Sequence, residues 1–107
     1  MIDAQHFIDA KAFQLSNYAD ALVTGKIQST EVDLYCWDTI EEWSQVKPRN
    51  AYMTPTESAF WYLLHQITFW NPKELRACPE LRSEVDSCID FLRGDGLYPE
   101  FISGVRP

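Results

Sequence analysis

The sequence predicts an all-α fold, a small bundle of four to five helices with a central apolar helix over about residues 55–70 and an extended C-terminal tail packed on it. Apolar residues recur at spacings of three and four along most of the 107-residue chain, and this is the periodicity of one helix face. Cap residues followed by Pro, at Thr54 and Asn71, indicate two helix starts. A chain of this length has room for one hydrophobic core, so we expect a single domain over residues 1–107.

The first predicted helix runs from Asp3 to Thr24. Gly25 is expected to end it, because glycine readily adopts the left-handed conformation that follows a helix. A break is the alternative, with Ser16 ending one helix and Asn17 capping a second. One side of the segment is apolar, and its residues follow alternating spacings of four and three: Ala4, Ile8, Ala12, Leu15, Ala19 and Leu22.

A second helix is predicted to start at Ser29 and Thr30, whose hydroxyl groups can accept hydrogen bonds from the free amides of a first turn. Pro48 is expected to end this segment, because proline lacks an amide hydrogen and restricts the residue before it. The helix has two distinct faces, one apolar and one acidic: Val32, Cys36, Ile40 and Trp43 on the first, and Glu31, Asp38 and Glu42 on the second.

The central helix has the strongest start signal in the chain. Thr54 is placed as the cap, Pro55 occupies the first helical position, and Glu57 can reach back to the cap. Almost nothing between residues 59 and 70 is charged, so we expect other elements to surround this helix. Its most apolar face consists of four residues: Phe60, Leu63, Leu64 and Ile67.

Two shorter helices and a tail complete the prediction. Asn71 caps a short helix through Ala77, and Pro79 opens the last helix, which ends at Gly94. Turn residues after Gly94 argue against a further helix. The tail nevertheless carries apolar residues that are costly to expose, so it is expected to lie across the bundle: Leu97, Tyr98, Phe101, Ile102 and Val105.

Charge and cysteine usage exclude several classes of function. The net charge is −7 without clustered Lys or Arg, which disfavours nucleic acid as a partner. No apolar run is long enough to span a membrane, and the first residues lack the pattern of a signal peptide, so we expect a cytoplasmic protein that does not bind membranes. Three widely spaced cysteines, Cys36, Cys78 and Cys88, indicate reduced core thiols and no disulfide framework.

The sequence offers little catalytic chemistry. His6 and His65 are the only histidines, and neither has partners at metal-ligand spacing. The glycine-rich loops that hold phosphates and the GxSxG motif are missing. We therefore expect no metal, no cofactor and no enzymatic activity. An enzyme is the least favoured hypothesis, and it would use His65 with Tyr62 or a nearby carboxylate.

A mixed stripe lies opposite the apolar face of the central helix, formed by Ser58, Tyr62, His65 and Phe69. Two interpretations stay open: the stripe packs inside the domain, or it forms a contact surface for another protein. Phe13 and Phe91 lie off the apolar arcs of their helices and are expected to be exposed. The candidate partner-binding residues are therefore Phe13, Tyr62, His65 and Phe69.

The leading functional hypothesis is a small cytoplasmic module for protein–protein interaction or regulation, without catalytic activity, which self-associates as a homodimer or acts as a small regulatory subunit of a protein partner. The alternative is an acidic inhibitor that covers a basic partner surface, as an immunity-like protein or a nucleic-acid mimic does. Its acidic face would contain Glu31, Asp38 and Glu42. The alternative predicts that these charges lie on one continuous acidic surface. Acidic residues mixed with Lys and Arg around the whole surface would argue against it.

Overall fold

A computed structural model describes residues 4–46, 53–102 and 106–107 of the chain. These residues form five helices and no strand: α1 (Ala4–Val23), α2 (Ser29–Trp43), α3 (Pro55–Phe69), α4 (Pro72–Ala77) and α5 (Pro79–Leu92). The predicted all-α class and the number of helices are confirmed.

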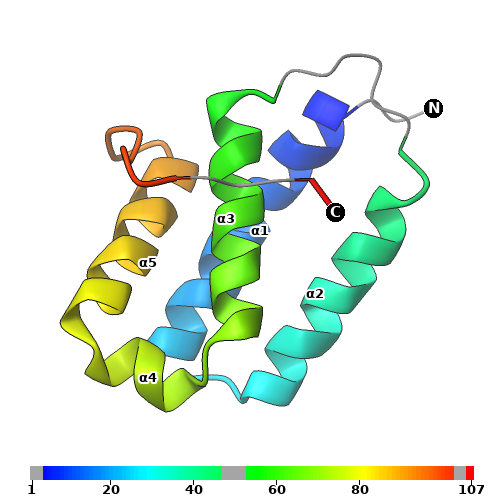
Figure 1. The fold of residues 1–107 in the computed structure, drawn as a ribbon. Coiled ribbons are helices and arrows are strands. Elements are labelled where there is room, and N and C mark those ends of the chain that lie inside the picture. The colour runs from blue at the N-terminus through cyan, green and yellow to red at the C-terminus, as the bar shows by residue number, and fades with distance from the viewer. Residues whose placement is uncertain (1–3, 47–52, 103–105) are drawn as a thin grey trace.

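The helices pack as an antiparallel bundle with α3 in a central position. Figure 1 shows α1 and α3 running in the same direction, with α2 and α5 running the opposite way on either side of them. α1, α3 and α5 pack on one another, while α2 packs on α1 and α3. Short connections place successive helices side by side in this arrangement. α2 is consequently an edge helix with an open outer side.

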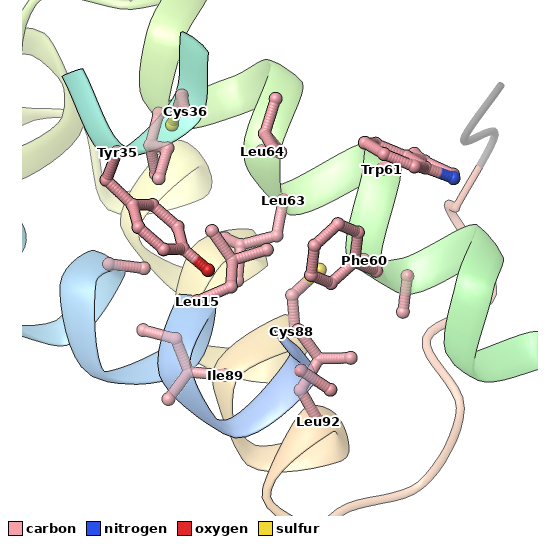
Figure 2. Close-up of a cluster of buried hydrophobic side chains, with 14 of the residues drawn as sticks. Leu15, Tyr35, Cys36, Phe60, Trp61, Leu63, Leu64, Cys88, Ile89 and Leu92 are labelled. Atoms are coloured by element: carbon pink, nitrogen blue, oxygen red, sulfur yellow. The ribbon is translucent and has the colours of Figure 1, made fainter. Parts of the chain in front are cut away.

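The core lies where α3 meets its neighbours. Side chains from α1, α2, α3 and α5 converge there (Figure 2). Phe60 and Leu63 of α3 and Leu15 of α1 are completely buried, and removal of a buried aromatic side chain such as Phe60 costs about 3–5 kcal/mol. The predicted apolar face of α3 is buried throughout, which confirms its role as the central helix.

Helix ends follow the expected chemistry in most places. Gly25 and Gly94 have φ angles of 76° and 85° after α1 and α5, so both glycine stops are confirmed. Thr54 Oγ1 accepts a hydrogen bond from the amide of Glu57 at 3.1 Å, as expected for a cap. Asn71 Oδ1 accepts one from the amide of Lys73 at 2.8 Å.

The predicted continuous first helix is confirmed, and the alternative break at Ser16 and Asn17 does not occur: the buried Ser16 hydroxyl donates to the carbonyl of Phe13 at 2.6 Å inside α1. α2 starts at Ser29, as predicted, but the expected hydroxyl cap is wrong, because the cap is Gln28, which provides no side-chain hydrogen bond. The helix ends at Trp43, and Pro48 lies outside the described residues.

The C-terminal end of α1 is closed by two arginines from the second half of the chain. Arg76 of α4 donates to the carbonyl of Leu22 through Nε and Nη2, at 3.2 and 2.9 Å. Arg82 of α5 donates to the carbonyl of Val23 at 3.2 Å. The last carbonyls of a helix lack partners within it and carry negative partial charge, so guanidinium groups stabilise this end.

The tail contacts α3, as predicted, but of its described apolar residues only Ile102 packs against the core, while Leu97, Tyr98 and Phe101 stay exposed. Phe101 contacts Tyr62 with 5.6 Å between ring centroids, and Ile102 packs against the core. Leu97 is 92% exposed, so its predicted burial is wrong: it lies in the turn after α5, before the tail reaches α3. Val105 lies outside the described residues.

A buried ion pair fastens the end of the tail to the bundle. The Glu57 carboxylate is only 3% exposed, and it accepts hydrogen bonds from Trp61 Nε1 at 3.1 Å and from Arg106 Nη2 at 2.8 Å. Arg106 Nε also donates to Glu57 Oε2, and its guanidinium lies 5.7 Å from the ring centre of Trp43. Both carboxylate oxygens are therefore engaged, and the expectation that Glu57 reaches back to its cap is wrong.

Replacement of Arg106 by Met should lower the free energy of unfolding by about 3 kcal/mol, because the Glu57 carboxylate stays buried without its counterion. Urea denaturation measures this loss. A second change, Glu57→Gln, should restore most of it in the double variant. Lys11→Met serves as the control, since it breaks the more exposed pair with Glu42 and should cost less than about 1 kcal/mol. Equal losses in the two single variants would contradict this assignment.

Candidate functional site

The predicted stripe on α3 faces outward. Tyr62, His65 and Phe69 lie on the side of α3 opposite the buried Phe60 and Leu63. Tyr62 is half-buried, His65 is exposed, and Phe69 is 64% exposed. Tyr62 packs beneath the tail, while the other two side chains reach the surface.

Two ring pairs lie one turn apart on the outward side of α3, Tyr62 with Phe101 of the tail and His65 with Phe69, and we call these four residues the aromatic face. The rings of His65 and Phe69 stack with centroids 5.7 Å apart, and Trp70 meets Phe69 edge to face at 4.9 Å. Burial raises the pKa of Tyr62 above its usual value, with smaller contributions from Glu84 and Cys88. The Tyr62 hydroxyl therefore stays protonated at neutral pH.

Phe13 does not belong to the aromatic face. It is 60% exposed on the outward side of α1, and α1 packs on α3 through its opposite, buried side. The core thus separates Phe13 from the other three predicted partner-binding residues. Phe91, also expected to be exposed, is half-buried, because its ring packs edge to face on Tyr98 of the tail at 5.3 Å.

The three predicted acidic residues share the exposed side of α2. Glu31, Asp38 and Glu42 are all exposed, and the Glu42 carboxylate pairs with Lys11 Nζ of α1 at 2.8 Å. A surface hollow of about 360 Å³ lies at the C-terminal half of this helix. Four residues line it: Asp38, Glu41, Glu42 and Gln45.

Leu34 and Trp37 are exposed residues of α2 that the sequence reasoning missed. Their exposed fractions are 65% and 69%, among the highest of the large apolar residues described. They sit one turn apart among the carboxylates of the outer side. The signal was available in the sequence, because both fall on the helix side opposite Val32 and Cys36.

A second hollow, of about 460 Å³, lies where the α1–α2 connection meets α4. Lys26, Ser29, Thr30 and Arg76 are among the residues that line it. The Arg76 guanidinium already binds the carbonyl of Leu22, so this basic group is engaged in closing α1.

Two of the three cysteines are core residues, as predicted, and the third is not fully buried. Cys36 and Cys88 are buried and Cys78 is half-buried, and all three are free thiols. Burial raises the pKa of Cys36 and of Cys88 to about 12, with smaller contributions from Asp33 and Glu84. The Tyr35 hydroxyl is also buried, and it has no hydrogen-bond partner among the described residues.

Alkylation of the native protein near pH 8 should modify Cys78 first and leave Cys36 and Cys88 largely unmodified. Raised pKa values keep both buried thiols protonated at this pH, and the thiolate is the reactive form. Mass spectrometry after a short treatment with iodoacetamide identifies the modified site. Denaturant should expose all three, and rapid modification of Cys36 in native protein would contradict its burial.

The residues of the enzyme hypothesis are engaged with different neighbours. His65 stacks on Phe69, whereas Tyr62 contacts Phe101 of the tail. The described part of the chain contains no group of three His, Cys, Asp or Glu side chains able to hold a metal ion. Within that same part, none of the helices has the length and apolarity needed to cross a bilayer.

Neither the family models, the curated proteins nor the solved structures compared with this chain give a match.

Proposed function

We propose that this chain is a protein-interaction module without catalytic activity, and that it self-associates through the aromatic face of α3. The observation that carries the proposal is a pair of ring contacts on the outward side of the central helix, Tyr62 with Phe101 of the tail and, one turn further along, His65 with Phe69. Aromatic side chains supply large apolar area with few rotatable bonds, and they are enriched where proteins dock.

Charge supports a second copy as the occupant of this face. Each copy carries a net charge of −7, so two copies repel each other over most orientations. Residues 58–71 contain no Asp, Glu, Lys or Arg, and Glu57 at the start of the helix is buried against Arg106. Contact through the aromatic face therefore brings together a stretch of α3 that carries no acidic or basic residue.

The position of the face also suits a symmetric contact. In a two-fold dimer the same patch meets itself, so each residue finds its own counterpart or a near neighbour. Aromatic rings accept one another in edge-to-face and offset stacked arrangements, as Phe69 already does with Trp70 and His65. Exposed Phe69 would lose most of its water contact in such a dimer.

The same proposal covers location and partner class. A cytoplasmic protein is supported by the three free thiols, which persist in a reducing compartment. A protein partner is favoured over nucleic acid because 16 acidic residues stand against 9 basic ones. Binding by a preformed aromatic surface needs no cofactor.

Sedimentation equilibrium should find a dimer at roughly 100 µM chain concentration. Phe69→Glu should weaken the dimer more than tenfold, since it places a carboxylate from each copy in the contact. Because Phe69 is exposed, circular dichroism should show the fold unchanged.

Phe13→Glu is the matched control, because it alters an equally exposed phenylalanine on the other side of the core. It should leave the dimer constant within about twofold. A strict monomer at the highest concentration, or equal effects of the two substitutions, would overturn the proposal.

A further inference from the structure

The outer side of α2 exposes apolar area that the fold does not cover. Leu34 and Trp37 lie opposite the buried Val32 and Cys36, and more than three fifths of each side chain is exposed. Burial of a tryptophan side chain is strongly favourable, and Trp is the residue most enriched among those that dominate binding energy. Among the helices described, α2 packs on α1 and α3 at the edge of the bundle, and none of them lies over its outer side (Figure 1).

Negative charge is concentrated on the same helix. α2 contains five acidic residues and no basic one, which amounts to −5 of the net −7 of the chain: Glu31, Asp33, Asp38, Glu41 and Glu42. Only Glu42 has a cationic partner within the described residues, Lys11. The hollow lined by Asp38, Glu41 and Glu42 follows Trp37 along α2, and its carboxylates would attract a cationic side chain of a partner.

This concentration of negative charge lowers the stability of α2. Asp38 is three and four residues from Glu41 and Glu42, at spacings where like charges repel. The last turn of α2 holds no basic residue, although the negative end of a helix is stabilised by cations. Cations supplied from outside would relieve both effects at once.

We propose that the outer face of α2 binds a Lys- and Arg-rich amphipathic helix of a partner protein. Apolar side chains of that helix would cover Leu34 and Trp37, and its basic residues would pair with the carboxylates on either side of them. The one-turn separation of Leu34 and Trp37 matches the spacing at which amphipathic helices present their apolar residues. The partner helix would lie along α2 as a further member of the bundle.

Charge excludes the other occupants of this face. A second copy would bring five carboxylates against five, and nucleic acid would bring phosphates against them. This surface shares no residue with the aromatic face of α3, so the inference goes beyond the proposed self-association and does not depend on it.

A fluorescently labelled synthetic peptide of Leu and Lys, about 18 residues long with its leucines at spacings of three and four, is a suitable probe. Fluorescence anisotropy should show saturable binding to the intact chain. Trp37→Ser should weaken binding more than tenfold, and the pair Asp38→Lys with Glu41→Lys should do so as well. Increasing the salt concentration should weaken it further, since exposed ion pairs are screened.

Three controls make the result specific. A peptide of the same composition in scrambled order should bind at least tenfold more weakly. Equal binding of the two peptides would mean that only unspecific charge attraction is measured, and it would overturn the proposal. Phe13→Ser and Glu80→Lys alter an exposed aromatic residue and an exposed carboxylate elsewhere, and both should leave binding unchanged. Unaltered binding by Trp37→Ser would also refute the assignment. The Phe69→Glu variant should bind the peptide like the unmodified chain, which separates this surface from the dimer contact.

Discussion

The fold depends on the burial of one side of α3. Phe60 and Leu63 lie in the middle of this side, and both are completely buried, because exposure of such large apolar side chains to water is unfavourable. α1 and α5 cover this side, and α2 closes a flank where Trp43 meets Trp61 edge to face at 5.0 Å. On the remaining side of α3, the described part of the tail covers Tyr62 and leaves His65 and Phe69 at the surface. The position of the aromatic face thus follows from how the central helix is packed.

Local sequence signals predicted the helices well, but they could not predict contacts between residues that are distant in sequence. Thr54 and Asn71 act as caps because a hydroxyl or amide oxygen binds an amide two or three residues away. Glu57 also looks like part of that local pattern, yet its carboxylate is committed to Arg106, 49 residues further on. No periodicity or motif reports a pair of this kind, since only the folded chain brings the two groups together.

Surface and core aromatics could be separated only in part. Periodicity placed Tyr62, His65 and Phe69 opposite the apolar face of α3 and left open whether they are covered. The half-buried state of Tyr62 depends on the tail, which the pattern cannot position. Trp37 and Trp43 lie in one helix and differ in exposure, 69% against 6%. Residue type alone does not distinguish the two tryptophans, but their positions around the helix axis do. Sequence analysis that considers only the apolar face of α2 therefore overlooks Trp37.

The arginines that close α1 also constrain how the chain acquires its structure. Arg76 follows Leu22 by 54 residues and Arg82 follows Val23 by 59. While the polypeptide is being synthesised, the carboxyl end of α1 emerges well before the guanidinium groups that satisfy its carbonyls. α1 and α2 together also lack the cover that α3 and α5 give to Leu15. The amino-terminal half is therefore not expected to be stable by itself. We expect folding to be a single cooperative transition that requires the second half of the chain.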